Sequence, residues 1–284
     1  DTAPLNHARL GHTATALPNG KVVVVGGLAR QATGVSVVSF VEVYDPTAGA
    51  WEVPEETFQS GGLFHSAARI GAAGVLSCGG IDPAFRFSDA CQIISANGAI
   101  QAADDLASPI IHARMTTLMD GRVLLTGGFD ASGRSFAGRF DMDFEATNEA
   151  WIYEDGTWRS LPPLKLRRAM HSTAVLPGGR VIIAGGVTEV SATSPRDDAY
   201  SGLLFDSADA ITCVEIFDPD TETFTKLDSC TETTDSSTLT QRTALAAMAA
   251  DPYFGLLLAG GVSAEAGLPT EEALLFYPTY ASLD

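Results

Sequence analysis

Short apolar runs that end in paired glycines recur along this chain. Residues 20–30 read GKVVVVGGLAR, in which four consecutive valines precede Gly26 and Gly27. Branching at Cβ favours an extended strand, and a run without polar residues predicts a strand buried on both faces. The two glycines predict unusual backbone angles or a close approach that a Cβ atom would prevent.

The same pattern returns four more times, as VLSCGG, VLLTGG, VIIAGG and LLLAGG. Successive copies are 48 to 75 residues apart, near the period of about 50 of one class of propeller repeat. The sequence therefore contains an internal repeat, and we assign the extra length of the later copies to loops. The five glycine pairs are Gly26 and Gly27, Gly79 and Gly80, Gly127 and Gly128, Gly185 and Gly186, and Gly260 and Gly261.

The flanks of the glycine pairs repeat as well. Upstream, RLGHTATALPNGK at residues 9–21 matches RAMHSTAVLPGGR at residues 168–180. His12, His65 and His171 each stand 15 residues before the second glycine of their copy. Downstream segments such as VEVYDPTAGAW and AWIYEDGTW predict a strand, a tight turn and a further strand that opens near Trp51 or Trp158.

Each copy thus predicts four strands that follow one another as a meander. Because the second strand is apolar on both faces, neighbouring copies must stack face to face around an axis. The predicted fold class is all-β, a β-propeller with five recognisable four-stranded blades in a single domain of residues 1–284. The predicted blades cover approximately residues 7–59, 60–107, 108–164, 165–237 and 238–284.

The repeats resemble those of the kelch family, which combine a hydrophobic run, a double glycine, a later Tyr or Phe, and a Trp. This resemblance covers essentially the whole chain and implies a propeller that in most members binds proteins and in a minority is an enzyme. The family's copper oxidases need a cysteine beside a tyrosine ligand, together with histidines. The cysteines here fit hairpin pairs better, and we locate no catalytic set typical of the sialic-acid epimerase relatives.

Kelch rings usually have six or seven blades, so five copies leave two interpretations. The chain forms a complete small ring, or it is a segment of a longer propeller whose other strands lie outside it. We favour the complete ring, because an open one would expose two large apolar blade faces.

The four cysteines fall into two local pairs. Cys78 and Cys91 stand at the two ends of the second-to-third-strand connection of the second copy, and Cys213 and Cys230 flank a hairpin of the fourth. Directly opposed strand residues have Cβ atoms about 4.5 to 5.5 Å apart, close to disulfide reach. We predict two disulfides, with four buried free thiols as the alternative. Disulfides favour an extracytoplasmic protein that is secreted, periplasmic or surface-anchored.

Net charge limits the classes of partner. The chain carries 35 acidic and 17 basic residues, a formal charge of −18, which repels nucleic acid and anionic membranes. No apolar run approaches the roughly 18 to 20 residues that cross a bilayer. We therefore expect no nucleic-acid partner and no membrane insertion by this chain.

The longest connections between second and third strands are expected to carry function. They cover residues 129–147 in the third copy and 187–210 in the fourth, and we expect both to project from one rim. The candidate residues of this binding rim are Arg134, Arg139, Asp141, Asp143, Glu145, Arg196, Asp197, Asp198, Tyr200 and Phe205.

Metal and catalytic chemistry have weaker signals. Asp141, Asp143 and Glu145 alternate, so in an extended segment they would project on one side as calcium ligands do, but they lack EF-hand spacing, and solvated acids are the alternative. For the three equivalent histidines we expect structural hydrogen bonds to a neighbouring strand or loop rather than metal binding. We assign no catalytic residue and no cofactor.

Three functions remain open. The leading one is a noncatalytic scaffold that binds a protein, or a surface glycan, through the long-loop rim. The second is a carbohydrate-active enzyme of the oxidase or epimerase class, with acids such as Asp141 or Asp197 beside its substrate. The third is a structural subunit of a larger extracytoplasmic assembly.

Overall fold

The computed structural model describes residues 2–32, 34–56, 61–72, 74–134, 143–191, 207–211, 213–226, 243–244, 247–251, 255–259, 262–263 and 273–276. These residues form strands, turns and irregular connections, with no helix among them. No membrane-spanning helix is therefore found in the described part of the chain.

Five antiparallel sheets correspond to the five sequence repeats. Four of them have four strands, and the fifth has three strands in the described residues. The first strands are β1 (Thr13–Ala16), β7 (Ser66–Ile70), β12 (Arg114–Thr117), β18 (Ser172–Val175) and β25 (Ala247–Asp251). The second strands are β2 (Val22–Val25), β8 (Gly74–Cys78), β13 (Val123–Thr126), β19 (Val181–Ala184) and β26 (Gly255–Ala259).

The third and fourth strands complete each meander. The third strands are β5 (Val41–Asp45), β9 (Cys91–Ser95), β16 (Ala150–Glu154), β22 (Val214–Asp218) and β28 (Ala273–Phe276). The fourth strands are β6 (Ala50–Glu52), β10 (Ile100–Ala102), β17 (Thr157–Ser160) and β23 (Thr223–Lys226). The strand order matches the order predicted from the repeat, and each sheet is one blade.

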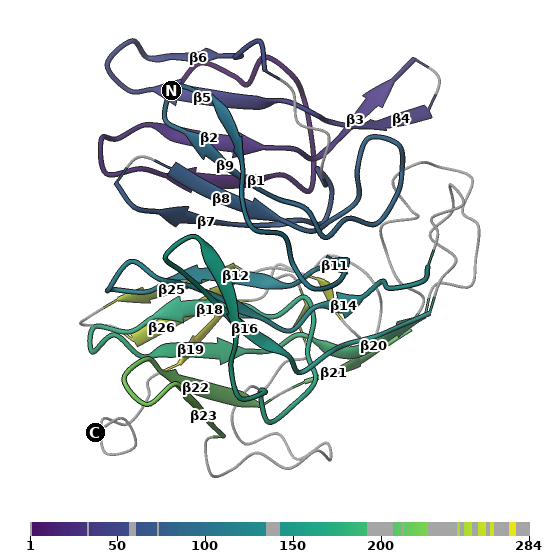
Figure 1. Cartoon of the computed structure of the whole chain (residues 1–284), viewed down its shortest axis with the longest axis vertical. Helices are drawn as coiled ribbons and strands as arrows, with labels where there is room; N and C mark the ends of the chain where they lie inside the picture. Colours follow the sequence, from purple (N-terminus) through teal and green to yellow (C-terminus); the bar gives the residue numbers. More distant parts are fainter. Residues whose placement is uncertain are drawn as a thin grey trace.

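First strands of successive blades lie against one another. β1 contacts β7, β7 contacts β12, β12 contacts β18, and β18 contacts β25. Each first strand is therefore the innermost strand of its blade, and the blades follow one another in chain order (Figure 1). This arrangement is the β-propeller predicted from the sequence.

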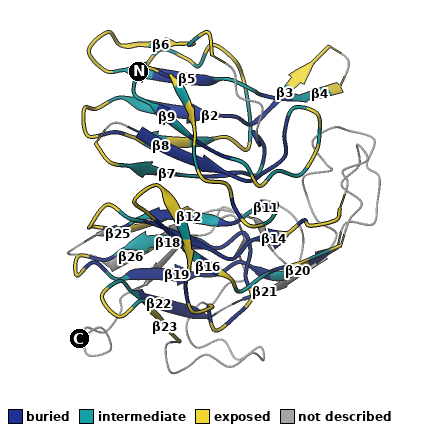
Figure 2. Ribbon diagram, in the orientation of Figure 1, coloured by how far each residue is buried: buried dark blue, intermediate teal, exposed yellow. Residues whose placement is uncertain are grey.

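The second strands are buried on both faces because they lie between two neighbouring blades. Val75 of β8 packs with Val23 and Val25 of blade one, whereas Leu76, the next residue, packs with Leu125 of blade three. Neighbouring side chains of one strand thus enter different interfaces. Figure 2 shows the result as dark blue central strands between exposed turns and edges.

The glycine pairs are required by close backbone approaches. A Cβ atom at Gly26, Gly79 or Gly127 would overlap the carbonyl oxygen of the link into the next blade. The second glycine of each of the first four pairs packs instead against the start of its own innermost strand, as Gly80 does against His65. Gly80 and Gly128 also donate their amides to those link carbonyls, at 2.8 Å each. One glycine therefore permits packing between blades and the other permits packing within a blade.

We predict that Gly127→Ala destabilises the protein far more than Gly71→Ala. Both glycines have a left-handed backbone, with φ of 54° and 58°, which costs an alanine about 1 to 2 kcal/mol at either site. At Gly71 the added methyl group meets open space, whereas at Gly127 it meets backbone. We expect the free energy of unfolding to fall by at least about 2 kcal/mol more at Gly127, measured by urea denaturation. Equal losses at the two sites would contradict the packing role.

Candidate functional site

The connections between second and third strands gather on one rim. In blade one they form the hairpin β3 (Leu28–Gln31) and β4 (Gly34–Val37), and in blade four they form β20 (Val187–Ser191) and β21 (Ser207–Ala210). Both hairpins extend from the same side of the blades, on the right of Figure 1. The described parts of these connections therefore form β-hairpins on one side of the blades.

The long connections of blades three and four pair with each other. β15 (Phe144–Glu145) from blade three hydrogen-bonds to β20, which gives the three-stranded sheet β15–β20–β21. Shorter pairings elsewhere join β11 (Ile110–Ile111) to β14 (Phe129–Asp130) and β24 (Thr243–Ala244) to β27 (Val262–Ser263). We call the three-stranded unit the rim sheet; it binds the two longest connections into one surface.

An apolar layer lies directly beneath the rim sheet. The layer joins residues of blades one to four, drawn from the links between blades and from the rim connections. Phe129 and Val187 are fully buried within it, and Phe144 packs against its edge. The buried members of this layer are Leu28, Val37, Leu63, Ile81, Ile111, Phe129, Ala146, Ala169, Met170, Val187 and Val190.

Three predicted rim residues fall in the described chain, and the structure places them around Phe144. Arg134 donates Nη1 to the carbonyl of Asp143 and places its guanidinium 4.7 Å from the centre of the Phe144 ring. Glu145 forms an exposed ion pair with Arg167 at 3.3 Å. Phe144 packs against the apolar layer. Asp143 and Glu145 therefore flank a residue whose side chain faces inward.

The other rim candidates lie outside the described residues, so the structure does not test them. They are Arg139, Asp141, Arg196, Asp197, Asp198, Tyr200 and Phe205. Cys230, Gly260 and Gly261 fall outside in the same way. Within the described residues no group of three or more metal-ligating side chains is found, and the proposed calcium set includes Asp141, so that hypothesis stays untested.

Each innermost strand of blades one to four is preceded, two residues earlier, by a residue with positive φ. These lead-in residues are Gly11, Phe64, His112 and Met170. Outside glycine this conformation is uncommon and costs about 1 to 3 kcal/mol, so it persists only where surrounding contacts hold it, and it concentrates at functional sites. The sequence repeat did not reveal this feature, because four different residue types occupy the equivalent positions.

Backbone hydrogen bonds connect the lead-in residues across blades. His112 donates its amide to the carbonyl of Phe64 at 3.0 Å, and Met170 donates to the carbonyl of His112 at 3.1 Å. The His112 ring also stacks on the Phe64 ring, with centroids 4.1 Å apart. These contacts hold the strained conformations and fix one end of the innermost strands beneath the rim.

Two of the three repeated histidines, His65 and His171, have the structural role expected from the repeat. His65 Nε2 lies 2.8 Å from Thr13 Oγ1 of blade one, and His171 Nε2 lies 2.9 Å from Thr126 Oγ1 of blade three. Each bond therefore ties a blade to the preceding one. Burial lowers the pKa of His65 to about 4, and burial with the charges of Arg168 and Arg114 lowers the pKa of His171. Both rings are neutral at pH 7.

Two buried ion pairs were missed by the sequence reasoning. Arg9 pairs with Glu42 at 2.6 Å, and Arg168 pairs with Glu215 at 2.8 Å, with every one of these side chains fully buried. The two pairs are equivalent, because both arginines stand three residues before the repeated histidine. Arg168 also donates to the carbonyls of Gly185 and Cys213, and Glu215 accepts the amide of Lys165. The repeated VEVYD and VEIFD motifs were the available signal.

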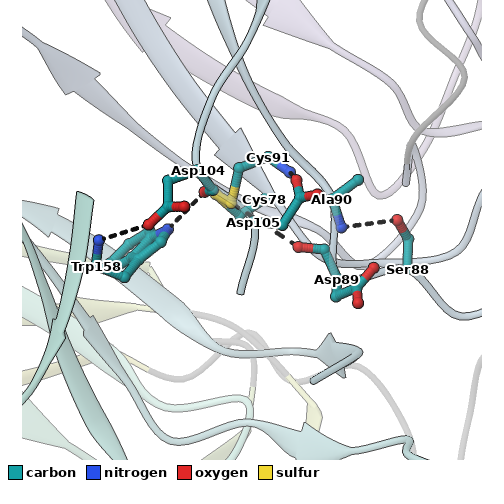
Figure 3. Close-up of a disulfide and its surroundings, with 8 residues drawn as sticks. All are labelled: Cys78, Ser88, Asp89, Ala90, Cys91, Asp104, Asp105 and Trp158. Carbon is teal, nitrogen blue, oxygen red and sulfur yellow. Dashed lines mark hydrogen bonds between the residues drawn. A yellow bond between two sulfur atoms is a disulfide. The ribbon is translucent and has the colours of Figure 1, made fainter. Parts of the chain in front are cut away.

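The first predicted disulfide is present. Cys78 and Cys91 are bonded, with their Cα atoms 4.2 Å apart and their residues directly opposed in β8 and β9. Figure 3 shows that the link to blade three runs beside this bond: Asp105 accepts the Cys91 amide, and Asp104 accepts both Trp158 nitrogens through its carboxylate and its carbonyl. Cys213 is also disulfide-bonded; its expected partner, Cys230, is not among the described residues.

Comparisons with known proteins agree with this fold. No family model matches the sequence, and no curated protein is similar enough to be matched. The solved structures that resemble the chain include YjhT and a fungal alcohol oxidase. The structure of YjhT has a TM-score of 0.70 and 14% identity, over 96% of this chain and 83% of that one.

The second is a fungal alcohol oxidase of the AA5 family, in complex with copper, with a TM-score of 0.65 and 17% identity. The match covers 98% of this chain and 55% of the oxidase, so the chain spans about half of that protein's length. These identities establish the fold alone. The predicted resemblance to kelch-type propellers is therefore confirmed at the level of the fold.

We predict that His65→Gln removes part of the acid sensitivity of the protein. The pKa of His65 in the folded state is about 4, below the value of about 6.5 in an unfolded chain. The unfolded state therefore binds the proton first, and stability falls as pH drops from 6.5 towards 4. Linkage gives a loss of about 2 kcal/mol between pH 7 and pH 5 for this one group.

Urea unfolding at the two pH values measures this difference. The Gln variant keeps a side chain that can hydrogen-bond to Thr13, and its loss on acidification should be smaller by about 2 kcal/mol. The same pH dependence in both proteins would show that His65 is not buried as a neutral ring.

We predict that Arg168→Met destabilises the protein by about 3 kcal/mol or more, because Glu215 then remains buried without its counter-charge. Adding Glu215→Gln should recover part of this loss, since the neutral amide still accepts hydrogen bonds. A double-mutant cycle in urea measures the coupling.

Arg159→Met is the matched control. Arg159 meets Glu222 at 2.7 Å, as short as the buried pair, but its side chain is half exposed. Its loss should cost less than about 1 kcal/mol. Similar costs at Arg168 and Arg159 would refute the importance of burial.

Proposed function

We propose that this protein is a binding propeller that captures a protein partner through the rim sheet and the residues it carries. The observation that supports this proposal most directly is the pairing of β15 with β20, which joins the long connections of two blades. A rigid scaffold that presents long connections on one surface is a common arrangement for recognition.

The geometry of the rim sheet favours a role in presenting the segment between β20 and β21 to a partner, rather than a role as a plain connection between strands. The ladder between β20 and β21 ends with Ser191 directly paired to Ser207. The two strand ends that flank residues 192–206 are therefore adjacent. Val190 anchors β20 in the apolar layer, so the base of this segment is held in place by packing.

The compartment is part of the proposal. A bonded Cys78–Cys91 pair and a bonded Cys213 favour an oxidising environment. We infer that the protein works outside the cytoplasm, where it meets proteins and surface glycans.

We predict that closing the β20–β21 hairpin abolishes partner capture without loss of the fold. Residues 192–206 are replaced by Asn-Gly, since directly paired Ser191 and Ser207 suit a two-residue turn. A partner is first captured from the native source with the full chain and identified by mass spectrometry. Its affinity for the full chain and for the hairpin-closed variant is then measured with purified proteins, and we expect a loss of at least about tenfold.

A second variant controls for a surface change away from the rim sheet. Glu222→Ala removes a charge from a different turn, between β22 and β23, and should leave partner affinity unchanged. Thermal unfolding of both variants should stay close to that of the full chain. Unchanged affinity in the hairpin-closed variant would overturn the rim assignment. Loss of binding after enzymatic deglycosylation of the partner would identify a glycan instead, and turnover in a glycan screen would favour an enzyme.

A further inference from the structure

Arg114 lies at the junction of the innermost strands of blades three and four. It is the first residue of β12, and its Nε donates to the carbonyl of His171 at 3.2 Å. Two residues further along the strand, Thr116 donates to Thr173 of β18 at 2.7 Å. Since alternate strand residues share a face, Arg114 and Thr116 both face blade four.

Arg114 differs from the other enclosed arginines in having no acidic partner. Arg9 and Arg168 are each paired with a buried glutamate. Among the residues that the structure describes, no carboxylate forms an ion pair with Arg114, and its Nε contact is its one side-chain hydrogen bond. Removing a guanidinium from water without a counter-charge is costly, and burial accordingly lowers the pKa of Arg114. The chain accepts this cost although it carries twice as many acidic as basic residues.

The surroundings of Arg114 add no compensating negative charge. His112 stands two residues before it, and burial together with the charge of Arg114 lowers the pKa of His112 to about 3. The charge of Arg114 also contributes to the lowered pKa of His171, whose ring is neutral. Phe64 covers one face of His112 by stacking. The local environment is therefore one fixed cation among neutral and aromatic groups, held by the strained lead-in residues.

We propose that Arg114 anchors a binding site for a small carboxylate-bearing molecule at this junction. The two terminal nitrogens of Arg114 would donate in parallel to the two carboxylate oxygens. Arg114 is only partly buried, so a ligand can reach it from solvent. This site belongs to an innermost strand and is independent of the long rim connections, so it goes beyond the proposed capture of a protein partner.

The charge count favours a carboxylate over a phosphate. A planar guanidinium matches a carboxylate through two parallel hydrogen bonds, and one positive charge balances one negative charge. A dianion would need a second cation, and in the described residues the neighbouring titratable groups are the neutral histidines His112 and His171.

The test is a titration of the full chain with acetate, observed by NMR at the arginine Nε–H groups. Sodium acetate replaces sodium chloride at constant pH and ionic strength. The Nε–H signal of Arg114, assigned by its disappearance in Arg114→Gln, should shift to saturation. Arg114→Lys has no such Nε–H group, so its acetate binding is followed, as in the full chain, at the backbone amides of residues 114–116. Lysine keeps the charge but lacks the planar pair of donors, and should bind acetate at least about tenfold more weakly, which corresponds to 1.4 kcal/mol.

Arg69→Gln is the matched control, because Arg69 lies on the neighbouring innermost strand β7 and donates to a carbonyl, that of Gly71. It should leave the acetate titration unchanged. A shift that grows linearly without saturation, or that is equal in Arg114→Lys, would overturn the proposal. Tighter binding of sulfate than of acetate would overturn the carboxylate assignment.

Two further measurements keep the interpretation clear. Near-ultraviolet circular dichroism shows whether Arg114→Gln folds; if it does not, the comparison with Arg114→Lys decides. The hairpin-closed variant should bind acetate as the full chain does, so loss of partner capture and loss of the anion site are separate outcomes.

Discussion

The structure depends on the close approach between the first glycine of each of the first three pairs and the link that enters the next blade. At Gly26, Gly79 and Gly127 the space for a side chain is taken by a backbone carbonyl oxygen of that link. The approach brings one blade within hydrogen-bonding distance of the next, as in the bond from Gly128 to Arg168. A methyl group at these positions would separate the blades and expose the apolar faces of the second strands.

Polar groups support the same junctions. His65 and His171 each bond to a threonine of the preceding blade, and the Arg9–Glu42 and Arg168–Glu215 pairs fill equivalent positions beside the glycines. Buried polar groups are costly when unpaired, and each of these side chains has at least one hydrogen-bonding partner at the junction. Arg114 stands at the same level of the blades but has no carboxylate partner in the described part of the chain, which is why we propose a ligand for it.

The rim and the innermost strands have different properties that suit different roles. The rim sheet joins the connections of two blades over an apolar layer, and we propose it as the surface for a macromolecular partner. The lead-in residues hold strained backbone close to Arg114 and His112, where we propose the site for a small ligand. Both features rest on the same apolar layer, since Met170 and Val190 belong to it.

The repeat alone was enough to predict the fold, the blade order and the Cys78–Cys91 pairing. These features are encoded locally: a strand buried on both faces needs apolar residues without interruption, and a hairpin sets which residues oppose each other. The tertiary structure was needed to reveal the partners of Glu42 and Glu215, which lie 33 and 47 residues from their arginines. It was also needed for the pairing of β15 with β20, and for the missing counter-charge at Arg114. Each arginine–glutamate pair lies within one blade, but it joins the entering link to the third strand, which only folding brings together. The β15–β20 pairing and the surroundings of Arg114 depend on which blades and connections meet in space, and no spacing within one repeat records that.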